Sequence, residues 1–528
     1  MSLTSFYFFV FVLFVLTVYF IIPIKYRWLS LLICSYIFYA FAGIEYVIFL
    51  LFTTITTYIT GVQLNRYNID LDNAIKRSKS NNKNNIKLLY KKKKKKILLP
   101  GLIINLSVLV VFKYTNDFIS YINSFVKIFK VDVVVNPITL LVPLGLSYYI
   151  FQSVGYIIDL YRNKYRAEKN FFRYALFISY FPQIIQGPIS RYDELSKQLF
   201  IGHSFDSVRI KNGAVLMLWG LFKKLVIADR LGLLVNAIFN NYPEYLGSYI
   251  IVGGVLYSFQ VYGDFSGGID IARGVSEMLG IILPQNFQRP FFATSLQEYW
   301  RRWHISLNNW LRDYIFYPIS LSKTFVKLGK KCRSLLGQRI GKNLAIYIAT
   351  LIVRLIMAIW HGMSLKYIVQ GLFHGLLIIC GIHFAPELKL LTNKLKIRTN
   401  CFSWKLYQII RTFILAGIAR IIVRADNITV AWEMLKSTIT VYNPWILVDG
   451  SLFRLGLSAA DFMLVIFALL VLFCVSLCQE CGIHIRESLN KQNIVFQWII
   501  IYGLFICIVI FGIYGSGYDA SSFIYQQF

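Results

Sequence analysis

The sequence predicts an all-α integral membrane protein that crosses the bilayer many times. Of its 528 residues, 57% are hydrophobic and only 15% are charged, which is too apolar for an ordinary soluble domain. Apolar runs of about 20 residues, the length of a helix that crosses a bilayer, recur from one end of the chain to the other. Because hydrocarbon offers the backbone no hydrogen-bond partners, we expect these runs to be helices.

Apolar segments of this kind follow one another along the chain. We predict membrane helices at residues 5–24, 27–43, 45–62, 97–113, 138–158, 171–187, 213–239, 248–264, 343–361, 367–384, 407–423, 461–479 and 494–514. The first is not a convincing signal peptide, because no basic residue precedes it and no small-residue cleavage site follows it before Pro23. Between 263 and 318, Gly, Pro and aromatic residues make the apolar pattern less regular.

Residues 63–96 interrupt the apolar pattern with twelve lysines and arginines, six of them consecutive at 91–96. A polar Ser-Asn-Lys stretch at 78–85 adjoins them, so we predict a solvated loop. By the positive-inside rule this loop is cytoplasmic, and three preceding spans then place the N-terminus outside. The same rule accounts for the formal net charge of +30, so membrane lipid is the expected partner and nucleic acid is not.

The cysteines do not form a recognisable disulfide or metal pattern. Cys34, Cys380 and Cys507 lie inside apolar runs, where disulfides are not expected. Cys474, Cys478 and Cys481 share one helical face, but no carboxylate or His pair stands near them at ligand spacing. We therefore expect small buried hydrophobic residues and no metal.

Two histidines occupy apolar surroundings. His361 ends an apolar helix, and His374 follows in the next apolar segment. Ionisable residues inside a membrane are functional hypotheses by default, and burial favours a neutral imidazole that can accept a proton. A histidine satisfied by a neighbouring carbonyl is an equally favoured alternative. Gly362 and Ser364 predict a break between the two histidines, so their separation cannot be derived from the sequence.

Residues 297–314 have the pattern of one amphipathic helix that lies in the membrane interface. One face carries Trp300, Trp303, Leu307, Trp310 and Tyr314. Arg301, Arg302 and Arg312 lie on or near the other face. His304 lies at the margin of the aromatic face, where it either lines a site or is incidental to a membrane-surface helix.

Asp264 and Asp270 follow an apolar run in a glycine-rich segment. Carboxylates in such a position must pair with a cation or meet water. The glycines indicate either a break in the helix or a close approach of the backbone to a neighbour. A structural polar network and a catalytic role are equally compatible with this pattern.

Together these segments resemble the alginate O-acetyltransferase branch of the membrane-bound O-acyltransferase family. The matching blocks, in the family's order, are residues 143–153, 156–162, 181–191, 264–270, 283–290, 299–307, 310–314, 360–362 and 523–528. The chain departs from the family pattern at Gly263, Leu365, Lys366 and Gln370. These departures leave the catalytic histidine in place and bear on the identity of the donor and acceptor.

The resemblance implies a polytopic helical bundle in which interfacial and re-entrant helices surround a tunnel. The chain then divides into N-terminal transmembrane helices (1–62), the basic cytoplasmic loop (63–96), a catalytic core (97–425) and C-terminal transmembrane helices with a terminal aromatic motif (426–528). The family transfers an acyl group from a cytoplasmic thioester, acetyl-CoA or an acyl carrier, to a hydroxyl. In this branch the acceptor is usually an extracytoplasmic polysaccharide, reached with an esterase-like partner at the bacterial cytoplasmic membrane. No bound cofactor is expected.

The resemblance also implies roles for individual residues. His361 is the expected general base, because a hydroxyl is a poor nucleophile at neutral pH. His304 resembles the family's second characteristic histidine. The remaining candidates for the tunnel or the donor site are Arg301, Arg302, Trp303, Asp264 and His374. The terminal aromatic motif suggests that Tyr525 is transiently acylated, because a phenol is far more acidic than a sugar hydroxyl; an interfacial aromatic role is equally favoured.

Two alternatives remain at this point. D-alanyl transfer to teichoic acid is the closer one, although that branch is usually shorter and departs more from blocks 148–162 and 523–528. A membrane transporter would explain the spans and the buried polar residues, but it would not require the Trp-His-Gly and Arg-Trp-His blocks in this order.

Overall fold

The computed structural model describes residues 2–78, 82–129, 134–138, 140 and 142–514. These residues form helices and one isolated β-bridge, between Phe287 and Trp303. The chain separates into two compact units. The first comprises Met1–Met217 and Ile271–Pro284, and the second comprises Leu218–Asp270 and Gln285–Phe528. The predicted all-α class is therefore confirmed for the described residues.

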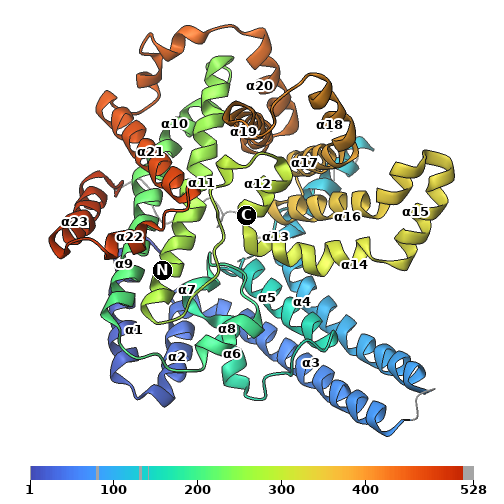
Figure 1. Cartoon of the computed structure of the whole chain (residues 1–528). Coiled ribbons are helices and arrows are strands. Elements are labelled where there is room, and N and C mark those ends of the chain that lie inside the picture. Colours follow the sequence, from blue (N-terminus) through green and yellow to red (C-terminus); the bar gives the residue numbers. More distant parts are fainter. Residues whose placement is uncertain (1, 79–81, 130–133, 139, 141, 515–528) are drawn as a thin grey trace. The chain divides into compact units, whose positions relative to one another are not determined.

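The first unit is built around two long helices that lie side by side, α3 and α4 (Figure 1). Its helices are α1 (Phe6–Ile21), η1 (Ile24–Tyr26), α2 (Arg27–Ala40), α3 (Ile44–Arg77), α4 (Lys83–Ile128), α5 (Leu146–Tyr161), α6 (Phe171–Ser179), α7 (Phe181–Ile184), α8 (Tyr192–Leu199) and most of α9 (Ser207–Leu221). The helices α3, α4 and α5 pack against one another, and α2 packs on α6.

The prediction of a loop at 63–96 is wrong. Residues 63–77 continue α3, and residues 83–96 form the beginning of α4. Lysine is a good helix former, so a run of lysines need not end a helix. The Lys94 ammonium is buried and donates to the Asn68 side chain and to the Tyr161 carbonyl, at 2.9 Å each. The predicted domain limit at residue 97 lies inside α4, while the cytoplasmic side of this basic segment stays a prediction.

The second unit contains the remaining helices. They are η3 (Phe222–Ala228), α10 (Asp229–Asn240), α11 (Ser248–Met278, whose last turns belong to the first unit), η4 (Pro290–Phe292), α12 (Leu296–Arg302), α13 (Ile305–Leu311), η5 (Arg312–Phe316), α14 (Tyr317–Ser320), α15 (Lys323–Leu336), α16 (Gln338–His361), α17 (Leu365–His383), α18 (Ala385–Lys394), α19 (Phe402–Arg424), α20 (Ile428–Thr440), η6 (Pro444–Leu447), η7 (Ser451–Arg454), α21 (Ala459–Glu480), α22 (Ile485–Asn490) and α23 (Ile494–Phe511). The segments η3 and η5 are π-helical.

Seven of the described helices are long and apolar enough to cross a membrane, namely α3, α4, α16, α17, α19, α21 and α23. Each of them overlaps one of the predicted apolar segments. The chain is therefore a multi-pass membrane protein.

Single helices across residues 138–158 and 171–187 were expected, and this prediction is wrong. α5 begins only at Leu146, after Gly145 in the left-handed conformation with φ 70°. A Cβ atom at Gly145 would lie 2.0 Å from the Ile184 carbonyl oxygen, so this backbone crossing requires glycine. The second segment is divided between the short helices α6 and α7.

Candidate active site

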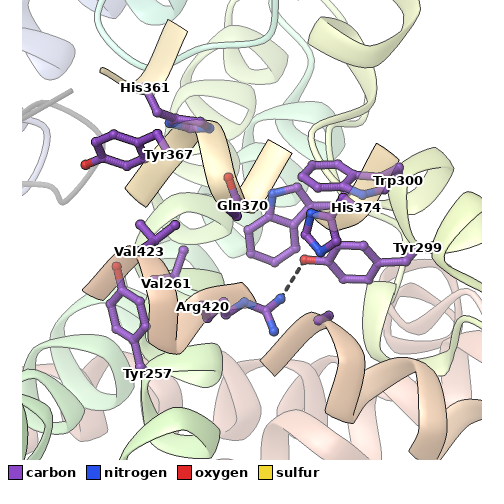
Figure 2. A pocket seen from close by; sticks show the side chains of 12 residues that line it. Tyr257, Val261, Tyr299, Trp300, His361, Tyr367, Gln370, His374, Arg420 and Val423 are labelled. Carbon is purple, nitrogen blue, oxygen red and sulfur yellow. Dashed lines mark hydrogen bonds between the residues drawn. The ribbon is translucent and has the colours of Figure 1, made fainter. Parts of the chain in front are cut away.

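A small cavity lies among α11, α12, α16, α17 and α19 of the second unit (Figure 2). Its volume is about 70 Å³, enough for a short acyl group or a few water molecules. The lining residues are Tyr257, Val261, Tyr299, Trp300, Trp303, His361, Tyr367, Gln370, His374, Ala416, Arg420 and Val423. The cavity thus has largely aromatic walls and a few polar groups, which is typical of small-molecule sites.

The two predicted histidines both line this cavity. His361 is the last residue of α16, and the predicted break separates it from α17, which begins at Leu365. Its ring stacks on that of Tyr367, with 6.2 Å between the ring centroids. His374 is only 3% exposed, and its ring lies 5.2 Å edge-to-face from Trp300. The His374 Nε2 atom has no hydrogen-bond partner among the described residues. Figure 2 shows His361 and Tyr367 on one side, with Trp300 and His374 on the other.

The prediction of a single interfacial helix at 297–314 is wrong, because the helix is interrupted at His304. The backbone of His304 is in the left-handed conformation, with φ 47°. His304 directly precedes α13 and follows Trp303, the β-bridge residue. The Asn286 carbonyl accepts from Ile305 N–H at 3.0 Å, and its side-chain oxygen accepts from Ser306 N–H at 2.8 Å. These backbone N–H groups bond to Asn286 and not to the preceding turn of a helix. The contacts with Asn286 therefore account for the break between α12 and α13.

His304 lies behind the cavity wall and is not among the described lining residues. Its side chain is 2% exposed and its ring is 5.8 Å from that of Trp360, the neighbour of His361. The side chain of Asn286 lies against the His304 ring, with its Nδ2 and Oδ1 atoms 3.2 and 3.4 Å from the ring Nδ1.

The two arginines predicted to belong to the tunnel or the donor site, Arg301 and Arg302, are not among the described lining residues of the cavity. The Arg302 guanidinium binds the carboxylates of Glu298 and Glu480, at 2.7 and 2.9 Å. Arg301 is exposed on α12. Of this block, Trp303 reaches the cavity wall, together with Trp300.

Asp264 belongs to a buried ion-pair cluster rather than to the cavity. α11 continues unbroken through its glycines, so the predicted break is wrong and the close backbone approach is confirmed. A Cβ atom at Gly267 would lie 2.7 Å from the Gly220 carbonyl oxygen. The Lys224 ammonium contacts Asp264 at 2.7 Å and Asp229 at 2.9 Å. Lys223, its neighbour in η3, contacts Asp270 at 2.7 Å in the same manner.

Several polar lining residues were missed by the sequence analysis. Tyr257, Tyr299, Gln370 and Arg420 all contribute to the cavity wall. A signal existed for Arg420, since an arginine within the predicted span 407–423 is an ionisable residue in an apolar helix. Tyr299 begins the matching block 299–307, and Gln370 was noted only as a departure from the family pattern, so neither was assigned to the site. Tyr257 has no distinctive local pattern, because tyrosine is common at helix surfaces.

Comparisons with known proteins agree with the resemblance. A family model of the membrane-bound O-acyltransferases matches residues 162–410. A probable alginate O-acetylase of Pseudomonas aeruginosa is 30% identical over 453 residues, which are 85% of this chain and 76% of the relative. The chain belongs to the membrane-bound O-acyltransferase family. It is therefore an O-acyltransferase, and this decides between the enzyme and the transporter.

Relatives with two different acyl groups match this O-acyltransferase. A peptidoglycan O-acetyltransferase of Helicobacter pylori is 29% identical over 441 residues, which are 78% of this chain and 73% of the relative. A teichoic acid D-alanyltransferase of Bacillus subtilis is 30% identical over 242 residues, which are 45% of this chain and 58% of the relative. Tyr525 and the rest of the terminal motif lie outside the described residues, so the acylation hypothesis stays a prediction.

Burial makes His304 a source of acid sensitivity. Desolvation, and secondarily the nearby His361, holds the pKa of His304 well below its usual range. An unfolded histidine gains a proton as the pH falls below about 6.5, whereas the folded one does not. The folded state is therefore fully favoured above that pH and loses about 1.4 kcal/mol per pH unit below it, until the folded pKa is reached.

We expect His304→Gln to reduce this acid sensitivity. The measurement is the fraction of purified protein that stays monodisperse in detergent after incubation at pH 7.5 and at pH 5. The ratio of the two fractions should be higher for the variant than for the wild type, even if the variant is less stable at pH 7.5. Equal ratios would show that His304 protonation does not limit acid stability.

Proposed function

We propose that this O-acyltransferase moves an acetyl group from a cytoplasmic thioester to a hydroxyl of an extracytoplasmic polysaccharide, or to a partner that modifies the polysaccharide. The location is the bacterial cytoplasmic membrane. The observation that carries the proposal is the small cavity lined by His361, since it joins a candidate base to space for a short acyl group. The donor is acetyl-CoA or an acetylated carrier, and the partner is of the esterase-like class.

The charge of the cavity supports acetyl over D-alanyl transfer. The described lining residues include Arg420 and no aspartate or glutamate. A D-alanyl group carries an amine that is largely protonated at neutral pH, and Arg420 would repel it without a carboxylate to offset the repulsion. An acetyl group has no charge and fits the aromatic walls. D-alanyl transfer is the second candidate, supported by the relative from Bacillus subtilis.

The proposed reaction is a base-assisted acyl transfer. His361 accepts the proton of the acceptor hydroxyl while the hydroxyl oxygen attacks the thioester carbonyl carbon. The carbonyl π electrons move to the oxygen, and they return as the C–S bond breaks. The leaving thiolate takes the proton from the His361 imidazolium, so the products are an ester and a free thiol. The same balance holds if the phenol of Tyr525 is the first acceptor.

In this proposal the remaining predicted residues shape the site and hold its parts in place. Asn286 holds His304, which packs against Trp360 and thereby restrains the end of α16 that carries His361. Trp303 and His374 line the space for the acyl group. Arg302 and Asp264 act through their ion pairs. Arg301 is accessible to the phosphates of the donor.

Mass spectrometry of surface glycans tests the proposed function. Cells that lack the gene should lose ester-linked acetyl groups, and the intact gene should restore them. Loss of D-alanyl esters instead would establish the second candidate. Unchanged levels of both esters would overturn the proposal.

A further inference from the structure

We propose that Arg420 binds the carbonyl oxygen of the acyl thioester and stabilises the negative charge that develops there during transfer. This inference rests on the proposed function and adds to it a second catalytic residue, contributed by α19. The residue is buried, with 8% of its surface exposed, and it lines the same cavity as His361.

The guanidinium of Arg420 is held by neutral groups from two other helices. Its Nη2 donates to the Tyr299 hydroxyl at 2.5 Å, as Figure 2 shows, and its Nη1 donates to the Ser258 hydroxyl at 3.0 Å. Ser258 in turn donates to the Gly254 carbonyl, so its oxygen presents a lone pair to the arginine. The position of the charge is thus fixed before any substrate binds.

Aromatic rings enclose the same guanidinium. The rings of Phe291, Tyr299 and Trp303 lie 5.4, 5.5 and 5.2 Å from its central carbon. Such contacts stabilise a cation and restrict its plane, but they supply no full negative charge.

The positive charge of Arg420 has no carboxylate partner among the described residues. A guanidinium has five N–H donors, and hydrogen bonds to two hydroxyls leave the other donors without an acceptor in the described part of the chain. A buried cation without an anion is costly to maintain. The His374 Nε2 atom, buried and without a hydrogen-bond partner among the described residues, lines the same cavity. Both observations point to a polar ligand atom inside the cavity.

The carbonyl oxygen of the thioester satisfies this requirement. It is neutral in the ground state and becomes an oxyanion when the acceptor oxygen adds to the carbonyl carbon. A donor that is already oriented and desolvated interacts more strongly with the oxyanion than with the carbonyl, which accelerates the reaction. His361 takes the proton of the hydroxyl, and Arg420 holds the oxyanion. When the C=O bond re-forms, the electrons of the C–S bond leave with the thiolate, which takes the proton from the His361 imidazolium.

Kinetics of Arg420→Gln test the inference, with membrane vesicles, acetyl-CoA as donor probe and polysaccharide from a deletion strain as acceptor. We expect kcat to fall by about 10²- to 10³-fold, as for loss of one oxyanion donor, with little change in KM for acetyl-CoA. Millimolar guanidinium should partly restore the activity of Arg420→Ala. Arg424→Gln is the matched control, one turn along α19, because Arg424 binds Asn236 and Asn240 instead.

The outcomes separate catalysis from support of the fold. A near-normal kcat, or a raised KM with normal kcat, would overturn the inference. If the variants lose activity in proportion to a lowered unfolding temperature, and guanidinium does not restore it, Arg420 only holds the helices together. If Arg420→Gln does not fold, Arg420→Lys keeps the charge and should fold, with kcat still lowered. If wild-type vesicles show no turnover that depends on His361, the proposed function itself is refuted. If the wild type turns over normally and Arg420→Gln is equally active, only this inference is refuted.

Discussion

Replacing His361 with alanine should lower acyl transfer by about 10²- to 10⁴-fold, the usual contribution of a positioned general base. The side chain ends α16 and lines the cavity, so its removal deletes the proton acceptor at the end of a helix and not in its middle. The variant should therefore stay folded in the membrane. The measurement is the rate of acetyl transfer from acetyl-CoA, normalised to the amount of monodisperse protein.

His383→Ala is the matched control for this prediction. His383 also ends a membrane helix, α17, but its Nδ1 lies 3.2 Å from the Tyr347 hydroxyl and it is not among the described lining residues. The control should retain wild-type turnover. Near-normal turnover of His361→Ala, with equal protein in the membrane, would remove His361 from the role of base.

Replacing Lys224 with methionine should destabilise the second unit by about 3 to 5 kcal/mol, the usual cost of breaking a buried ion pair on one side. The lysine is 2% exposed, and its ammonium lies between the carboxylates of Asp229 and Asp264. Without it, two buried anions face each other in a low-dielectric site. Thermal unfolding of the detergent-purified protein measures the effect.

Lys436→Met serves as the control, because Lys436 is exposed on α20 of the same unit. It should change stability by less than about 0.5 kcal/mol. The triple variant Lys224→Met, Asp229→Asn and Asp264→Asn should recover much of the loss, since it removes the unpaired charges as well. If Lys224→Met unfolds at the wild-type temperature, the cluster does not contribute to stability as argued.

The sequence by itself determined the helical membrane class and the family resemblance. Its thirteen predicted spans include a segment in each of the seven described helices that are long and apolar enough to cross a membrane, but they did not single these seven out. These properties depend on local hydropathy and on the order of short motifs, both of which can be read along the chain. The break between His361 and His374 was also local, because Gly362 and Ser364 mark it.

Only the tertiary structure decided which polar residues share the cavity and which pair elsewhere. Asp264 meets Lys224 because Gly263 and Gly267 allow α11 to approach η3, and the sequence pattern favoured neither this pairing nor a site. The helix predicted at 297–314 breaks at His304 because Asn286, distant in sequence, supplies competing backbone contacts. Arg420 joins His361 through the packing of α19, α17 and α16, which hydrophobic periodicity does not specify. Periodicity determines the apolar face of a helix, whereas the partner of a buried charge depends on contacts between segments far apart in the chain.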